Sequence, residues 1–251
     1  MSRLFATLTM APILTAASTR TVASLPKAQV VASTVDHSGA VYLTGTISSA
    51  DLPVTPGAFQ SQYHATTCSW PQWSFPCPDG FVVKFNAAGQ LVYATYLGGD
   101  GADRPAAIAV DEAGNAYVAG TTASSNFPLT DNRLADNSPV GGFVAKINAF
   151  GTGLVYSTRL PGVALTSAIA VDGLHRAHIA GNAAGPGLPV TPGAIQTQFH
   201  GAAGYGDGVV LKLSARGDQV LFATYLGGSS GDSITGLALD SEGNVYVATA
   251  G

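Results

Sequence analysis

The chain has 251 residues, of which 46% are hydrophobic and 10% are charged, and 11 Lys and Arg against 15 Asp and Glu give a net charge of −4. This apolar content can build a core, which argues against intrinsic disorder. The lack of a basic surplus argues against nucleic-acid binding, and the sequence contains no run of about 18 apolar residues that would cross a membrane as a helix.

The N-terminal segment, residues 1–28, allows two interpretations. Arg3 precedes an apolar stretch that ends in small residues, which is the pattern of a secretory signal peptide. Alternatively, residues 4–10 and 19–25 form two strands of the folded domain. The interpretations compete, because a segment that is cleaved off cannot be a strand.

A phrase with a Val-Asp or Leu-Asp pair, a glycine-containing turn and a second apolar run occurs four times along the chain. The copies span 34–45, 109–120, 170–181 and 238–249. Their repeated aspartates are Asp36, Asp111, Asp172 and Asp240. An aspartate followed by Gly or Asn between two apolar runs favours a tight reversal of the chain.

Two further phrases complete the repeat. The first covers 81–86, 143–148 and 209–214 and contains Lys84, Lys146 and Lys212; the second covers 91–99, 154–162 and 221–228. Short runs rich in Val, Ile, Tyr, Phe and Thr, bounded by Gly, Asn and Asp, are strand and turn signals. Each repeat therefore predicts four antiparallel strands joined mainly by hairpins, which is the blade of a β-propeller. A β-sandwich and a β-solenoid are the alternatives.

This repeat pattern predicts an all-β propeller with about four blades. The expected units are blade 1 at 29–99 with an inserted loop at 50–80, blade 2 at 100–162, blade 3 at 163–228 and a partial blade 4 at 229–251. Either the N-terminal strands complete the partial blade and close the ring, or the chain is part of a larger propeller. One of the two is expected, because an unpaired apolar edge promotes aggregation.

The phrases resemble the bacterial SBBP repeat, the "seven-bladed beta-propeller" repeat family, over about residues 29–251. They include Tyr-Leu-Gly-Gly at 96–99, Ala-Ile-Ala-Val-Asp at 107–111, Gly-Asn-Ala-Tyr-Val-Ala-Gly at 114–120 and Phe-Val-Ala-Lys-Ile-Asn at 143–148. The resemblance implies repeats found in large extracellular or cell-surface bacterial proteins, mostly without assigned activity. It supplies no catalytic residues, and the chain is too short for seven blades.

Two cysteines, Cys68 and Cys77, lie in the first inserted loop and flank a segment with two tryptophans and two prolines. A disulfide here would close a short, stiff loop, worth roughly 2–3 kcal/mol; two free thiols are the alternative. The spacing does not resemble a zinc site. A disulfide would fit an extracytoplasmic protein, either secreted or at the cell surface.

The same loop contains a second duplication. Residues 52–64 and 188–200 share ten of thirteen residues. Thr55 and Thr191 each precede a proline, which predicts the start of a single helical turn that packs Phe59 or Ile195 onto its blade.

Aromatic and histidine side chains in these loops are the candidate ligand-binding residues, because they suit sugars or protein surfaces. They are Tyr63, His64, Trp70, Trp73, Phe199, His200 and Tyr205. The alternative is that they pack each loop against its own blade. A repeated position such as that of the two histidines favours a structural role.

Motifs for catalysis or cofactors are not found: the sequence lacks His-Glu-x-x-His, a phosphate-binding glycine loop and Gly-x-Ser-x-Gly. Asp100, Asp103 and Asp232 offer oxygens to Ca²⁺, but without EF-hand spacing, so turn formation is the alternative. Arg104, Arg133, Asp136 and Arg176 are unrepeated charged candidates for an enzyme site. No catalytic residue, metal site or cofactor is therefore predicted.

The repeated lysines and aspartates lead to one structural hypothesis: they fix blade geometry through hydrogen bonds to neighbouring turns. The alternative is that each lysine extends to water. For function, we expect a non-catalytic, extracytoplasmic binding or scaffold module at a bacterial surface, with a protein or glycan ligand. A propeller-based polysaccharide lyase or hydrolase and a truncated fragment of a larger surface protein are the alternatives.

Overall fold

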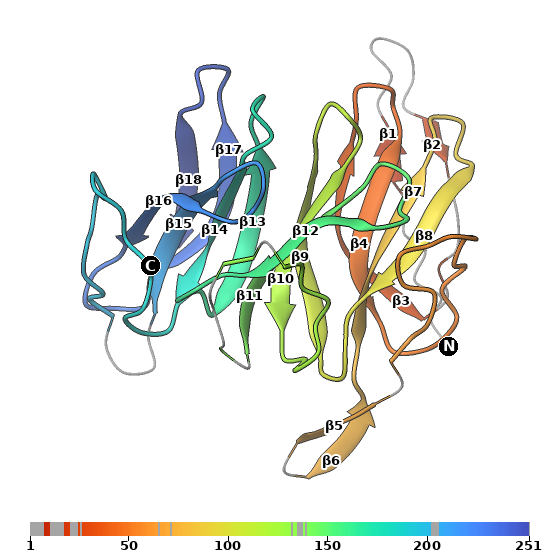
Figure 1. The fold of residues 1–251 in the computed structure, drawn as a ribbon, viewed down its shortest axis with the longest axis horizontal. Helices are drawn as coiled ribbons and strands as arrows, with labels where there is room; N and C mark the ends of the chain where they lie inside the picture. Colours follow the sequence, from red (N-terminus) through yellow and green to blue (C-terminus); the bar gives the residue numbers. More distant parts are fainter. Residues whose placement is uncertain are drawn as a thin grey trace.

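The computed structural model describes residues 8–10, 18–20, 25, 27–64, 66–70, 72–131, 133–134, 138, 140–201 and 206–250. All regular elements among these residues are β-strands, and they form antiparallel sheets that stand side by side in an arc (Figure 1). The all-β prediction is confirmed. None of the described residues form a helix that could span a membrane.

Three sheets have four strands, paired in chain order as hairpins. Blade 1 consists of β3 (Ala28–Val35), β4 (Val41–Ile47), β7 (Asp79–Phe85) and β8 (Leu91–Leu97). Blade 2 consists of β9 (Asp103–Val110), β10 (Ala116–Thr122), β11 (Gly141–Ile147) and β12 (Leu154–Arg159). Blade 3 consists of β13 (Leu165–Val171), β14 (Ala177–Ala183), β15 (Asp207–Leu213) and β16 (Val220–Leu226). A partial blade follows, with β17 (Ser233–Leu239) and β18 (Val245–Ala250).

The turn after the first strand of each blade is built by its aspartate. In blade 1, Asp36 Oδ1 accepts hydrogen bonds from the amides of Ser38 (2.9 Å) and Ala40 (3.0 Å). Gly39 has a φ of 79°, a left-handed conformation that glycine adopts without a Cβ clash. Aspartate and glycine at these positions therefore reverse the chain within a few residues.

Adjacent blades pack face to face through tyrosines. Tyr42 and Tyr93 are buried between blades 1 and 2, and Tyr117 and Tyr156 between blades 2 and 3. Ile234 of β17 packs on the far face of blade 3. Each blade thus covers the apolar face of its neighbour, which gives a series of thin cores between sheets.

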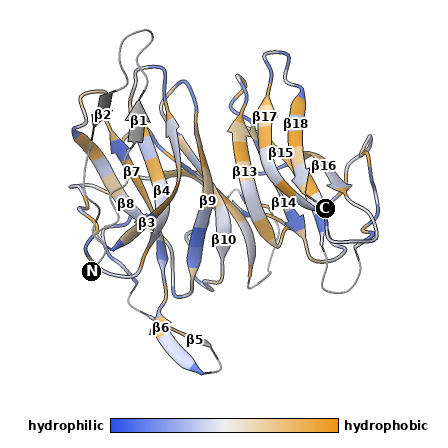
Figure 2. Cartoon of the chain, turned by 180° about the vertical axis from the view of Figure 1, so that it is seen from behind, coloured by the Kyte–Doolittle hydropathy of each residue, from blue (hydrophilic) through white to orange (hydrophobic). Residues whose placement is uncertain are grey.

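Two short strands are described near the N-terminus. β1 (Leu8–Met10) and β2 (Ser18–Arg20) pair with each other, and β17 and β18 form a separate two-stranded sheet. Figure 2 shows β17 and β18 beside blade 3, at the opposite end of the row of sheets from blade 1. The remainder of the predicted strands, residues 4–7 and 21–24, lies outside the described residues.

The prediction of a helical turn in the duplicated loop is wrong. Pro56 and Gly57 form a tight turn closed by the Ala58 amide on the Thr55 carbonyl (3.1 Å), with a φ of 78° at Gly57. Thr55 does not cap a helix, because its Oγ1 accepts a hydrogen bond from the amide of Ala94 in β8 (3.2 Å). The loop therefore runs along the outer strand of its blade.

Only one of the two expected apolar anchors packs. Phe59 is partly buried in the core between blades 1 and 2, and its amide donates to the carbonyl of Gly151 in blade 2 (2.8 Å). Ile195, at the same repeat position in blade 3, is 77% exposed.

Candidate functional site

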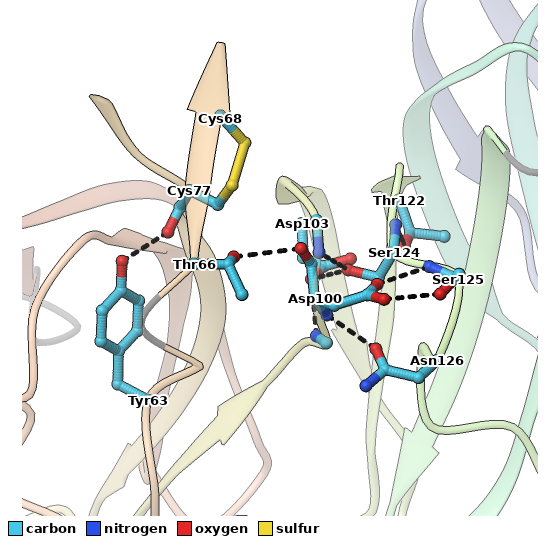
Figure 3. Close-up of a disulfide and its surroundings, with 12 residues drawn as sticks. Tyr63, Thr66, Cys68, Cys77, Asp100, Asp103, Thr122, Ser124, Ser125 and Asn126 are labelled. Carbon is cyan, nitrogen blue, oxygen red and sulfur yellow. Dashed lines mark hydrogen bonds between the residues drawn. A yellow bond between two sulfur atoms is a disulfide. The ribbon is translucent and has the colours of Figure 1, made fainter. Parts of the chain in front are cut away.

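A disulfide hairpin projects from the blade 1 end of the arc (Figure 1). It consists of β5 (Thr67–Trp70) and β6 (Trp73–Pro76), and Cys68 and Cys77 form a disulfide at its base. The base is also held by hydrogen bonds from the Tyr63 hydroxyl to the Cys77 carbonyl (2.6 Å) and from Thr66 Oγ1 to the Asp100 carbonyl (3.0 Å), both drawn in Figure 3. The hairpin is therefore anchored to the connection between blades 1 and 2.

The tip of the hairpin presents an aromatic side chain. Trp73 is 65% exposed. In the strand register it lies opposite Trp70, and the side chain of Trp70 is outside the described part. A pocket of about 380 Å³ opens at the base of the hairpin. It is lined by Ser48, Tyr63, Thr66, Thr67, Ser74, Phe75 and Pro76.

Two of the predicted ligand-binding aromatic residues pack against the outer strand of their own blade. The ring of Tyr63 lies 6.2 Å from that of Tyr96, and the ring of Phe199 lies 6.0 Å from that of Tyr225, centroid to centroid. Burial raises the pKa of Tyr63, as expected for a hydroxyl removed from water. Tyr205 lies outside the described residues.

The two predicted histidines are also used locally. The backbone amides of His64 and His200 donate to Oδ2 of Asp79 (2.9 Å) and Asp207 (2.8 Å), respectively. Their repeated position thus has a repeated structural use. The two loops belong to blades 1 and 3 with blade 2 between them, so their side chains do not converge on one site.

The repeated aspartates and tyrosines link successive blades. The Tyr42 hydroxyl lies 3.1 Å both from Asp36 Oδ2 and from the Gly114 carbonyl in the turn of blade 2. The Tyr117 hydroxyl contacts Asp111 Oδ2 (3.1 Å) and the His175 carbonyl in the turn of blade 3 (3.2 Å) in the same way. We call this arrangement the tyrosine latch.

The repeated lysines lie beside the latch. Lys146 Nζ is 3.1 Å from Asp111 Oδ2 and 4.7 Å from the centre of the Tyr117 ring, and its side chain is almost fully buried. Lys84 lies over Tyr42 at 4.8 Å, and Lys212 is 3.5 Å from Asp172 Oδ2. The lysines therefore contact the turn aspartate or the latch tyrosine of their own blade.

Blade 3 replaces the latch tyrosine with His178. Its Nε2 lies 3.1 Å from Asp172 Oδ2, and Arg176 Nε lies 2.7 Å from the same oxygen. Burial opposes ionisation of Asp172, but hydrogen bonds from these two residues outweigh it and hold the pKa of the carboxyl well below its usual range. Burial lowers the pKa of His178.

Two carboxylates are buried together at the junction of blades 1 and 2, and the sequence patterns do not predict this pair. Asp79 and Asp103 begin β7 and β9 and are both fully buried. Burial raises the pKa of Asp79 to about 6, with a further contribution from the Asp103 charge, and burial also raises the pKa of Asp103. The sequence signal was the repeated Asp-Gly at 79–80 and 207–208.

The remaining charged candidates do not assemble. Arg104 lies in β9, Arg133 donates to the Thr130 carbonyl (3.1 Å), Arg176 binds Asp172, and Asp136 is outside the described residues. Asp100 accepts hydrogen bonds from the amide (2.6 Å) and hydroxyl (2.5 Å) of Ser125, which join the segment before β9 to the segment after β10. Within the described ranges, no three His, Cys, Asp or Glu side chains gather as a metal-binding group.

Comparison with known proteins bears on these repeats. The family described as SBBP: Beta-propeller repeat matches residues 92–128 and 221–248. The first match runs from β8 of blade 1 through β10, and the second from β16 of blade 3 into β18. A search of curated proteins found no significant match. The resemblance seen in the sequence is confirmed at these two regions, which match the SBBP beta-propeller repeat.

Proposed function

We propose that the protein is a non-catalytic binding module outside the cytoplasm, at a bacterial surface, and that the disulfide hairpin contacts a neutral glycan. The observation that carries this proposal is the exposed Trp73 ring on a cross-linked support. An aromatic ring held in place binds a sugar face with little loss of conformational freedom.

The composition of the hairpin supports a neutral ligand. Residues 66–77 contain no charged side chain, but they contain Ser, Thr and Gln beside the aromatic residues. Hydroxyl and amide groups next to an aromatic face suit the alternating polar and apolar surface of a sugar. The disulfide supports the location, because such bonds persist in oxidising compartments.

A glycan array probed with the purified chain and with Trp73→Ala tests the proposal. We expect the wild-type chain to retain neutral glycans and Trp73→Ala to lose at least about 10-fold in affinity. The matched control is Phe150→Ala, because Phe150 is 77% exposed but lies in the turn between β11 and β12 of blade 2. It should bind as wild type does.

Two results would overturn the proposal. One is an array on which the wild-type chain retains no glycan, or on which Trp73→Ala and Phe150→Ala lose glycan affinity equally. The other is release of reducing or unsaturated sugar ends from a bound polysaccharide, which would favour the carbohydrate-active enzyme instead.

A further inference from the structure

The buried carboxylates between blades 1 and 2 converge on a single point. A Cβ atom placed on Gly98 would lie 2.8 Å from Asp79 Oδ1 and 2.8 Å from Asp103 Oδ2. The space above this glycine is therefore bordered by oxygens from both blades. Any side chain at position 98 would fill that space.

Half of the oxygen atoms in this pair lack a protein partner. Asp79 Oδ2 accepts from the His64 amide (2.9 Å), and Asp103 Oδ2 accepts from the Gly99 amide (2.8 Å) and the Ser124 hydroxyl (2.6 Å). The Oδ1 atoms of both aspartates are buried without a hydrogen-bond partner. A buried carboxylate oxygen without a partner is costly unless a proton or a cation meets it.

Two positive or titratable groups lie nearby and interact with the pair, but neither forms a hydrogen bond with the unpartnered Oδ1 atoms. Arg159 of β12 faces Asp103, but its Nη2 donates to the Ser124 carbonyl (2.5 Å). His64 Nδ1 lies 3.6 Å from Asp79 Oδ2 and contacts the Gln60 side-chain amide at 3.0 Å. Among the described residues no arginine or lysine forms a salt bridge with Asp79 or Asp103.

The same arrangement recurs between blade 3 and β17. Asp207 begins β15, and Asp232 directly precedes β17. A Cβ atom on Gly227 would lie 2.8 Å from Asp207 Oδ1 and 3.0 Å from Asp232 Oδ2, and Asp207 Oδ1 is again buried without a partner. Gly228 donates its amide to Asp232 Oδ2 (2.7 Å), as Gly99 does to Asp103.

The junction between blades 2 and 3 lacks all three components. Gly141 replaces the first aspartate, and Pro161 replaces the glycine. Ala164 stands eight residues before Asp172, as Asp103 stands eight residues before Asp111. Two aspartates and one glycine are thus present together at two junctions and absent together at the third. Joint presence indicates that they serve one purpose.

We propose that each carboxylate pair, Asp79 with Asp103 and Asp207 with Asp232, binds a Ca²⁺ ion between adjacent sheets. Two carboxylates balance a divalent charge, and Ca²⁺ prefers oxygen ligands in flexible geometry. Each pair supplies two side chains, so backbone carbonyls and water complete the coordination shell. The first ion would join the start of β7 in blade 1 to the start of β9 in blade 2. The second would join the start of β15 in blade 3 to the residue before β17.

Calorimetric titration of chelator-treated protein with CaCl₂, together with thermal unfolding in CaCl₂ and in EDTA, tests this proposal. We expect one ion bound per pair and a melting temperature that is higher in millimolar CaCl₂ by about 3 °C or more. Asp103→Asn should abolish binding at the first pair, and Asp232→Asn should abolish binding at the second.

Two further variants keep the test informative. Gly98→Ala keeps both aspartates in the sequence, but its methyl group fills the space between the carboxylates and pushes them apart, so it should also abolish the first site. Asp218→Asn is the matched control, since Asp218 lies in the turn between β15 and β16 and its Oδ1 accepts from the Ser214 hydroxyl (2.7 Å). It should bind Ca²⁺ as wild type does.

The proposal fails if wild-type protein shows no Ca²⁺-dependent heat and the same melting temperature in CaCl₂ and EDTA. It also fails if Asp218→Asn loses as much binding as Asp103→Asn. The melting temperature could instead rise on acidification from about pH 7 to about pH 5 and be the same with and without Ca²⁺. That result would show that each carboxylate pair shares a proton and binds no ion.

Discussion

The hydroxyl groups of the latch tyrosines each serve two blades. Tyr117 donates toward Asp111 of its own blade and toward the His175 carbonyl of the next, and its side chain is fully buried. Tyr246 keeps the contact with Asp240 (3.1 Å) but is 60% exposed. The same side chain thus occurs in a buried and an exposed setting within one molecule.

Removal of the Tyr117 hydroxyl should destabilise the protein. In Tyr117→Phe the buried Asp111 carboxylate and the His175 carbonyl each lose a partner, which should cost about 2 kcal/mol of unfolding free energy. Tyr246→Phe should cost less than about 0.5 kcal/mol, because water replaces the lost contact. Urea unfolding of both variants measures the difference, and equal losses would contradict a role for the latch.

Asp172 gives the protein a dependence on pH. Its pKa is lower in the folded state than the ordinary value of 3.8, so the ionised carboxylate stabilises the fold at higher pH. This contribution is fully present above about pH 5 and is lost as the pH falls through the unfolded and then the folded pKa. Asp172→Asn should remove that part of the acid sensitivity in urea unfolding between about pH 5 and pH 2. An unchanged slope would exclude Asp172 as its source.

The hairpins between the third and fourth strands carry another contact between blades. Gly151 has a φ of 71° and its Cα faces the ring of Tyr93, and Gly217 has a φ of 71° and faces the ring of Tyr156. A tyrosine of one blade therefore packs on the turn of the next. Only glycine satisfies both the backbone conformation and the close approach.

Gly217→Ala should be more damaging than the same change elsewhere. Its Cβ would collide with the Tyr156 ring, in addition to the cost of a positive φ, for a total of about 3 kcal/mol. Gly243→Ala is the control, because Gly243 has a φ of 85° but no atom within 4 Å of the new Cβ. That variant should cost about 1 kcal/mol. Similar melting temperatures for the two variants would show that the ring contact is unimportant.

The disulfide acts on the projecting hairpin rather than on the blades. It links residues nine apart, a restriction worth roughly 2–3 kcal/mol to the local loop. Reduction, or Cys68→Ser with Cys77→Ser, should expose residues 66–77 to proteolysis and leave the main melting transition within about 2 °C of wild type. Limited proteolysis and calorimetry measure these effects. Cooperative loss of the whole fold on reduction would contradict this assignment.

Sequence reasoning succeeded where contacts are local. The four-stranded repeat is predictable, because short runs rich in β-branched and aromatic residues, and the aspartate and glycine turns between them, are encoded within a few residues. It failed for the loop after Thr55, where a hydrogen bond to Ala94 decides the conformation. The Asp79–Asp103 pair is also not predictable from the sequence, because only the packing of two blades brings these residues together.

The tyrosine latch has a consequence for how such a molecule can be extended. Every latch bond runs from one sheet to the turn that follows it in the chain, so the contact depends on sequence order and never on a distant partner. Tandem copying of a unit that carries the tyrosine would therefore reproduce both a donor and an acceptor at each new boundary. Arrays of many lengths become accessible by duplication of such a unit, without a compensating change in the side chains of the latch.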